Sequence, residues 1–185
     1  MIDPSLRPVL AILASLLAIP LIFATSSRRN LREGVTIAAA LTKFGLIASL
    51  VPSVVWGGET HEASLFTLAS GIELALEVDA LGLLFGLLAS LLWIVTSFYS
   101  IGYMRGLDEH AQTRYFASFA ASLAAAVGVA FASNLLTLFV FYELLTVATY
   151  PLVTHDETDE ARAAGRKYLT YTFGGGVAVL AGTVL

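Results

Sequence analysis

Two ionisable side chains lie far inside apolar stretches of this 185-residue sequence, and they are Glu143 and Lys43. Glu143 follows Asn134 by nine residues and precedes Thr154 by eleven, which on a helix is roughly 13–17 Å from either end. A charged side chain at the centre of a bilayer costs about 2.5–3.5 kcal/mol on insertion scales, so a carboxyl group at that depth is a functional candidate. We predict that Glu143 transfers protons.

The chemistry of such a glutamate depends on its surroundings. Burial favours the neutral carboxyl group and a nearby cation favours the ionised one. The approach and withdrawal of a lysine would therefore make Glu143 release and take up a proton. The structural alternative is a neutral glutamic acid that joins helices by hydrogen bonds. The depth of the residue favours the first interpretation.

Lys43 is the second ionisable residue at this depth, because it lies ten residues after Glu33, or about 15 Å along a helix. Its ammonium group could pair with Glu143, line a water-filled path, or reach toward a polar region along its flexible stem. The sequence leaves these roles open. Lys43 is therefore a candidate for the proton path, with a structural role as the alternative.

His155 follows the apolar run that contains Glu143, and two roles are open to it. It either passes protons between the aqueous phase and a channel mouth or is an ordinary solvated loop histidine. No two of the three histidines, His61, His110 and His155, have the spacing of metal ligands on one helix, and the sequence has no cysteine. We expect neither a metal site nor a cofactor in this chain.

Six apolar runs must position these side chains, at 8–25, 34–56, 80–104, 114–133, 135–153 and 168–185. Each run is close to the roughly 20 residues that an α-helix needs to cross the hydrocarbon core. Hydrophobic residues make up 57% of the chain and charged residues only 13%, against roughly 25% charged in a soluble domain. The sequence predicts an all-α, polytopic transmembrane helical bundle that forms a single domain over 1–185. The last run ends at Leu185 without a polar flank, so we expect further helices to follow.

The charged residues predict the orientation of the bundle. Eight of the ten Lys and Arg residues lie around three alternate connections, and they are Arg28, Arg29, Arg32, Arg105, Arg114, Arg162, Arg166 and Lys167. The segment 57–79 contains five acidic residues and no Lys or Arg. The positive-inside rule therefore places the N-terminus outside and 57–79 in the periplasm of a bacterial inner membrane. The alternation of apolar and polar residues over 72–78 predicts a short strand or hairpin.

The glycine run at 174–176 has two interpretations, a local helix break that lines a path or close helix packing. Packing is favoured, because no other feature of the sequence marks a break. The run is not a phosphate-binding loop, since no Gly-Lys-Ser/Thr sequence follows it.

The most specific part of the sequence extends from 79 to 168. It contains, in this order, the segments 78–85 (VDALGLLF), 99–104 (YSIGYM), 114–116 (RYF), 134–145 (NLLTLFVFYELL) and 163–168 (AAGRKY). In order and spacing these segments resemble the antiporter-like proton-translocating subunits of respiratory complex I, membrane-bound hydrogenases and the Mrp-type cation/proton antiporters. The sequence around Glu143 resembles the D-type Mrp subunit or its hydrogenase counterparts most. Residues 1–78 match this superfamily in hydropathy only.

The resemblance implies specific roles for two residues. Glu143 matches the fifth-helix glutamate of the family, which works with a lysine on the seventh helix of a fourteen-helix subunit. Lys167 matches the basic residue at the start of the sixth helix, which either faces the cytoplasmic end of the path or marks the positive-inside boundary. The chain would then be the N-terminal portion of such a fold, and the seventh-helix lysine is not in it.

The function implied by the resemblance is that of a membrane subunit in a multisubunit complex that moves protons, with exchange for sodium as one version. Its partners would be other membrane subunits and lipid, with no nucleic acid, and the chain itself would not be a redox catalyst. The alternative is a structural membrane module that serves assembly without transport. An intramembrane enzyme ranks last, because only one buried acid and one buried lysine are visible in the sequence.

Overall fold

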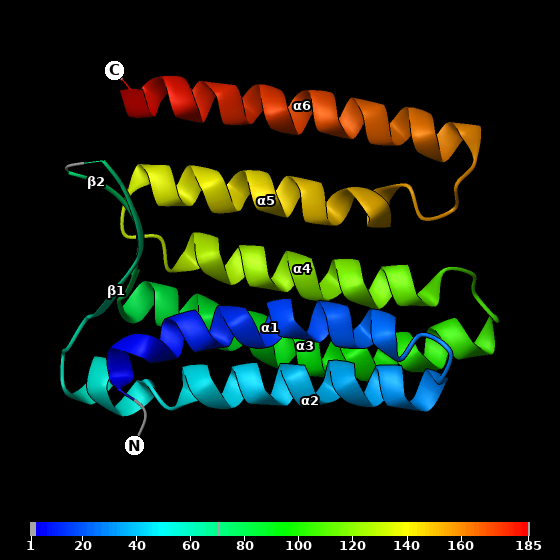
Figure 1. Cartoon of the computed structure of the whole chain (residues 1–185), viewed down its shortest axis with the longest axis horizontal. Helices are drawn as coiled ribbons and strands as arrows, with labels where there is room; N and C mark the ends of the chain where they lie inside the picture. The colour runs from blue at the N-terminus through cyan, green and yellow to red at the C-terminus, as the bar shows by residue number, and fades with distance from the viewer. Residues whose placement is uncertain (1–2, 70, 185) are drawn as a thin grey trace.

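The computed structural model describes residues 3–69 and 71–184. Six α-helices run roughly side by side along the long axis of the molecule, and a β-hairpin lies across one end (Figure 1). The helices are α1 (Arg7–Ala24), α2 (Arg29–Ala48), α3 (Ala80–Gly106), α4 (Gln112–Ala130), α5 (Leu135–Val153) and α6 (Asp159–Val184). A 3₁₀ turn (Pro4–Leu6) precedes α1, and a π-helical turn (Pro52–Trp56) follows α2. The all-α prediction is confirmed.

Five helices, α1 to α5, are long and apolar enough to cross a membrane within the described residues. Many large apolar side chains on their outer faces are exposed, among them Leu17, Leu84, Phe98 and Val147. An exposed apolar surface of this extent is typical of helices that contact lipid or other membrane subunits. The chain is therefore a multi-pass membrane protein.

The helices extend beyond the expected apolar runs mainly where charged residues occur. α2 begins at Arg29 rather than at 34, and α6 begins at Asp159 rather than at 168. A helix can continue past the hydrocarbon core with charged side chains, whereas a hydropathy window excludes those residues. Residues 168–184 of the expected sixth span, 168–185, form the second part of α6, and Leu185 lies outside the described residues. That helix is not among the five that meet the length and composition of a membrane span in the described part of the chain.

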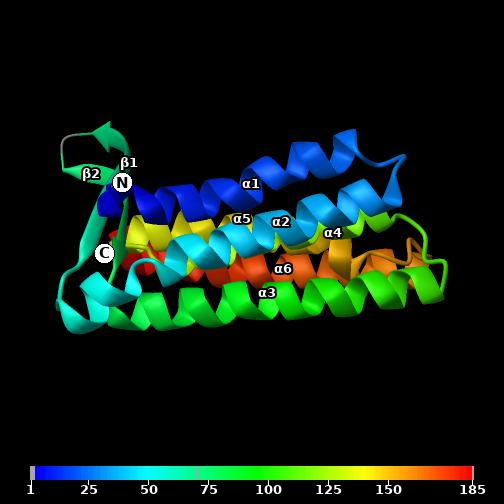
Figure 2. The ribbon, with the colours of Figure 1, turned by 90° about the horizontal axis from the view of Figure 1, so that it is seen from below.

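The order of packing places α6 at one side of the bundle. α5 packs between α4 and α6, and α1 packs against both α2 and α4. α2 also packs against α3, which contacts α4. Helices α1 to α4 therefore form a compact group, with α5 and then α6 added on one side, as Figures 1 and 2 show from two directions.

The connections between α1 and α2, α3 and α4, and α5 and α6 all lie at one end of the bundle (Figure 1). These are the connections around which most of the basic residues occur. The β-hairpin and the connection between α4 and α5 lie at the other end, together with the start of α1 and the end of α6. The alternation agrees with the arrangement from which the orientation was predicted.

The predicted strand is one half of an antiparallel hairpin. Strand β1 (His61–Ala69) pairs with β2 (Ile72–Val78), with His61 opposite Val78. The opposite edge of β2 bonds to the connection between α4 and α5, since Glu77 N donates to Phe131 O at 2.7 Å and Ser133 N donates to Ala75 O at 3.1 Å. The hairpin is thus attached to the membrane helices by backbone hydrogen bonds.

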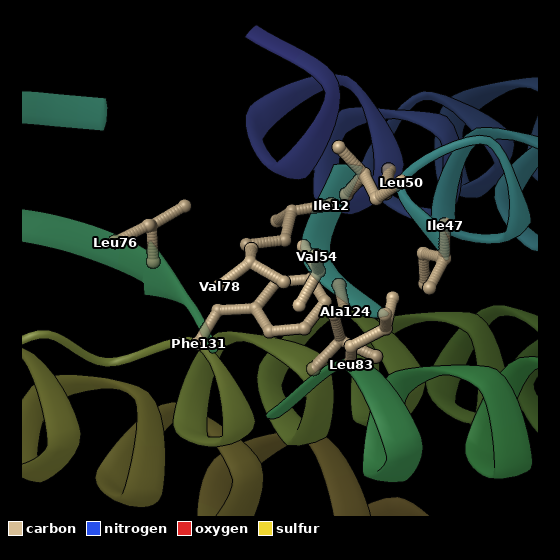
Figure 3. Close-up of a cluster of buried hydrophobic side chains, with 11 residues drawn as sticks. Ile12, Ile47, Leu50, Val54, Leu76, Val78, Leu83, Ala124 and Phe131 are labelled. Carbon is tan, nitrogen blue, oxygen red and sulfur yellow. The ribbon is translucent and has the colours of Figure 1, made fainter. Parts of the chain in front are cut away.

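The buried core at this end joins elements that are far apart in the sequence. Figure 3 shows side chains from α1, α2, the π-turn, β2, α3 and α4 packed together, including Ile12, Ile47, Val54, Leu76, Val78, Leu83, Ala124 and Phe131. Phe131 packs against Gly86 of α3, where a Cβ atom would lie 2.8 Å from the aromatic ring. The absence of a side chain at Gly86 therefore allows α3 to approach the end of α4.

Two polar residues fix the starts of α3 and α5. Asp79 Oδ1 accepts a hydrogen bond from Gly82 N at 2.7 Å, and Asn134 Oδ1 accepts one from Thr137 N at 2.8 Å. Such N-caps satisfy backbone groups that have no partner inside the helix. Because Asn134 caps α5, it also sets the depth at which Glu143 lies.

Candidate functional site

Glu143 lies near the middle of the nineteen-residue helix α5 and faces α6. Both carboxylate oxygens are buried, and neither has a hydrogen-bond partner among the described residues. A buried carboxyl group without a partner is costly, so its retention is typical of a functional group. That Glu143 transfers protons stays a prediction.

The carboxylate of Glu143 lies against Gly176 of α6. A Cβ atom at Gly176 would overlap Glu143 Oε1, whereas one at Gly174 would meet nothing within 4 Å. α6 is continuous through the three glycines. Close packing, which the sequence favoured for the glycine run, is therefore present at Gly176, where the group that packs is the carboxylate of Glu143.

Hydroxyl groups continue along the interface of α5 and α6 from Glu143 toward His155. Thr149 Oγ1 lies 2.6 Å from the hydroxyl of Tyr168 on α6. Thr149 follows Glu143 by six residues, or about 9 Å along the helix, and His155 follows Thr149 by the same number. Closer to Glu143, the hydroxyl of Tyr142 lies beside Gly175. This interface is polar at several depths.

Lys43 lies in the middle of the compact group α1 to α4 and is fully buried. Its Nζ atom donates to Ser15 Oγ on α1 at 2.9 Å and to the Leu123 carbonyl oxygen on α4 at 2.6 Å. Nζ also lies 5.6 Å from the centre of the Trp93 ring on α3. The lysine therefore contacts three other helices, and its side chain does not reach toward either end of the bundle.

The structure does not bring Lys43 and Glu143 together. The ammonium group of Lys43 contacts α1, α3 and α4, whereas the carboxylate of Glu143 lies on the side of α5 that faces α6. No ion pair joins them in the part of the chain that the structure describes. The pairing that the sequence left open is absent from this conformation.

His155 forms a cluster with two residues of the connection between α3 and α4. The rings of His155 and His110 are 4.8 Å apart, and Glu109 Oε1 lies 2.6 Å from His110 Nδ1 and 3.7 Å from His155 Nε2. His110 Nε2 contacts the His155 carbonyl oxygen at 2.9 Å. Both ring nitrogens of His155 are buried without a hydrogen-bond partner among the described residues. The sequence placed these histidines in separate connections and gave no sign of their contact.

Charges in this cluster have clear physical effects. Burial lowers the pKa of His155, and the neighbouring His110 and Arg114 lower it further. The pKa of the Glu109 carboxyl group is lowered by hydrogen bonds from the side chain and backbone of His110. Arg114 forms an ion pair with Glu157 and donates to the His155 carbonyl oxygen at 2.9 Å. The two connections are thus joined by several polar contacts.

Lys167 lies in the first part of α6 with its side chain exposed. It is at the same end of the bundle as the basic connections. The structure gives it no hydrogen bond or ion pair to the residues around Glu143 in the described ranges. Its role stays a prediction.

Sequence reasoning missed a buried ionic network at the start of α2. Glu33 is only 5% exposed and forms ion pairs with Arg32 and with Arg105 of α3. Arg32 also donates to Gln112 Oε1 of α4 at 2.6 Å. In the sequence these residues looked like ordinary charges of the basic connections, and only the packing of the three helices brings them together.

The chain has curated relatives among antiporter proteins. It is 31% identical over 165 residues to a probable K(+)/H(+) antiporter subunit, of type A/B, from Rhizobium meliloti (strain 1021), a match that covers 89% of this chain and 16% of the relative. It is 26% identical over 170 residues to the A1-type Na(+)/H(+) antiporter subunit of Staphylococcus aureus, covering 91% of this chain and 21% of the relative. The chain therefore spans only a small part of the length of these relatives. No family model matches it.

Two solved structures share the fold. A chain of the Mrp complex from Dietzia sp. DQ12-45-1b superposes with a TM-score of 0.78 at 21% identity, covering 98% of this chain and 34% of that one. A chain of the archaeal membrane-bound sulfane sulfur reductase gives the same TM-score at 18% identity, covering 92% and 34%.

Both curated relatives are of the A or A/B type, and they give no support to the narrower D-type assignment made from the sequence around Glu143. They agree, however, with the wider resemblance on which that assignment was based. From the sequence relatives and the shared fold we conclude that the chain belongs to the complex I-like superfamily of antiporter-type membrane subunits.

Proposed function

We propose that this chain is part of a membrane subunit that moves protons, and that Glu143 carries the proton across the middle of the membrane. The observation that supports this most is the burial of both carboxylate oxygens of Glu143 without a hydrogen-bond partner among the described residues. A structural glutamic acid would be expected to use its oxygens in hydrogen bonds between helices. The carboxylate instead lies against the backbone of Gly176.

The proton would move along the interface of α5 and α6. The hydroxyl pair of Thr149 and Tyr168 and, beyond it, His155 supply polar groups between Glu143 and the end of the bundle that carries the basic connections. Lys167 lies in the first part of α6, and we assign it to the mouth of the route at that same end. Mobile water between these groups would complete the route, because neighbouring members are too far apart for direct transfer.

Lys43 has a separate place in this proposal. Its ammonium group is held by Ser15 and by the Leu123 carbonyl oxygen, away from the interface of α5 and α6. A direct exchange of a proton with Glu143 would require a rearrangement of α5 against α4. We therefore assign Lys43 to a second polar site, within α1 to α4, and assign proton transfer across the middle of the membrane to Glu143.

The relatives' names indicate which ion to test. One relative is named for K(+)/H(+) and another for Na(+)/H(+) antiport. We propose that the intact complex, assembled with other membrane subunits in the bacterial inner membrane, exchanges protons for one of these monovalent cations.

The test is proton and cation transport by the intact complex in sealed membrane vesicles. Glu143→Gln keeps the size of the side chain and part of its hydrogen bonding but cannot ionise. The matched control is Glu160→Gln, which changes an exposed glutamate at the start of α6. We expect transport to fall at least tenfold in Glu143→Gln and to stay unchanged in Glu160→Gln, with equal amounts of assembled complex. Normal transport by Glu143→Gln would instead favour the structural module.

A further inference from the structure

The cluster of Glu109, His110 and His155 has the donor atoms of a metal site. Each of the three residues offers one ligand atom, and these atoms lie within 4.8 Å of one another. Two imidazoles and a carboxylate are a common ligand set for zinc, which then keeps a fourth position for water. We propose that Glu109, His110 and His155 bind a divalent transition-metal ion of the zinc class, through Glu109 Oε1, His110 Nδ1 and His155 Nε2.

The hydrogen bond at His110 prepares this ring for metal binding. A carbonyl oxygen only accepts hydrogen bonds, so His110 Nε2 carries the hydrogen in its 2.9 Å contact with the His155 carbonyl oxygen. A carboxylate likewise only accepts, so Nδ1 donates its hydrogen to Glu109 Oε1, 2.6 Å away. Ligating histidines generally donate their other ring N–H to a carbonyl or carboxylate group, which fixes the ring. A metal ion would replace that hydrogen between Nδ1 and the carboxylate, and the proton would be released to water.

His155 supplies the third ligand because its ring has no competing partner. Both of its nitrogens are buried without a hydrogen-bond partner among the described residues. Nε2 already lies 3.7 Å from Glu109 Oε1. Metal–ligand bonds of about 2.0–2.2 Å in a tetrahedral site place neighbouring donors about 3.3 Å apart. Shifts of about an ångström in side chains of two connecting segments would therefore complete the site.

The charge around the cluster permits a cation. Glu109 supplies one negative charge, and the adjacent Asp156 supplies another. Arg114 donates to the His155 carbonyl oxygen, and its ion pair with Glu157 offsets its charge. The bound ion would fasten the connection between α3 and α4 to the end of α5. The bound ion would occupy His155, the outer group of the proposed proton route, so metal binding is measured directly and without a transport assay.

Metal binding is tested on the full chain in lipid nanodiscs, stripped with a chelator and titrated with Zn²⁺ by calorimetry. We expect one ion per chain, and binding at least tenfold weaker in His110→Gln, His155→Gln and Glu109→Gln. His61→Gln is the matched histidine control, because His61 contacts Ser53 at the opposite end of the bundle. Asp108→Asn is the matched acidic control, because this neighbouring residue pairs with Arg29. Both controls should bind as the unchanged chain does.

A second measurement uses the unchanged chain, so it does not depend on the folding of variants. Zn²⁺ should protect His110, whose side chain is 48% exposed, from acylation by diethyl pyrocarbonate, with the modified residue identified by mass spectrometry. The proposal is overturned if Zn²⁺ does not bind saturably, if it binds equally well to the His110 and His155 variants, or if it does not protect His110.

Discussion

The two mid-membrane ionisable residues lie in opposite kinds of surroundings. Lys43 is enclosed by α1, α3 and α4, and its ammonium group donates two hydrogen bonds. Glu143 lies at the interface of α5 and α6 without a hydrogen-bond partner among the described residues. Lys43 and Glu143 therefore lie at similar depths along their apolar runs but differ in their hydrogen-bonding surroundings. A buried charge with partners is typical of a site that holds helices together, and one without partners is typical of a group that changes its protonation.

The sharpest test of this difference is at Gly176, which lies against the Glu143 carboxylate. In Gly176→Ala the new Cβ atom would overlap Glu143 Oε1 and displace the carboxylate. We expect transport by the assembled complex in vesicles to fall by about tenfold or more, because a misplacement of about 1 Å can cost a reaction that much. Gly174→Ala, which adds a Cβ in open space two residues away, should transport normally. Equal effects of the two variants would contradict the assigned role of Gly176.

Replacement of Lys43 should affect stability more than any change at Glu143. Lys43→Met keeps the stem of the side chain but removes Nζ, the donor to the Ser15 hydroxyl and to the Leu123 carbonyl oxygen. We expect a loss of about 2 kcal/mol in the free energy of unfolding, measured by denaturant titration in detergent. Lys167→Met, at an exposed position, serves as the control. Unchanged stability in Lys43→Met would remove the distinction between the two sites.

An added side chain at Gly128, between α4 and α5, tests whether the site of Lys43 and the site of Glu143 depend on each other. The Phe141 ring of α5 occupies the space where a Cβ atom of Gly128 would lie. Gly128→Ala should therefore cost about 1–3 kcal/mol of stability through overpacking. Gly102→Ala, where a Cβ would meet nothing within 4 Å, should cost far less. Thermal melting of both variants measures the difference, and transport shows whether a shift of α5 also reaches Glu143.

The smallest expected effect is at Ser15, which supplies one of the two acceptors of Lys43. Ser15→Ala leaves the hydrogen bond to the Leu123 carbonyl oxygen intact. Hydrogen bonds between membrane helices contribute about 0.6 kcal/mol on average, so we expect a loss of that size. The exposed Ser26 gives the comparison variant, Ser26→Ala. A loss as large as that in Lys43→Met would show that Ser15 is the main partner of the lysine.

Much of the fold could be predicted because membrane insertion imposes simple rules on sequence. Apolar runs of the required length predicted six helices, and the alternation over 72–78 predicted a strand. Helix ends were less accurate, since charged residues such as Arg29 and Asp159 continue a helix beyond the hydrocarbon core. The pairing of β2 with the connection between α4 and α5 was not predictable, because it depends on how the helices pack.

The site was predictable only in part. Depth along the chain identified Glu143 and Lys43 as residues that need an explanation, but depth contains no information about partners. The contact of His110 with His155, 45 residues apart, depends on the arrangement of two connections in space. The buried ion pair of Glu33 with Arg105 was hidden for the same reason. Long-range side-chain pairs of this kind leave no periodic signal in the sequence.

Strand β2 has hydrogen-bonded neighbours on both edges, with β1 on one side and the connection between α4 and α5 on the other. Its backbone amides should therefore exchange with deuterium more slowly than those on the outer edge of β1. Since Ser133 and Asn134 of that connection lead directly into α5, a displacement of this helix would pull on β2. Motion of α5 inside the membrane would then be measurable as a change in the deuterium exchange rate of the hairpin amides at the aqueous surface.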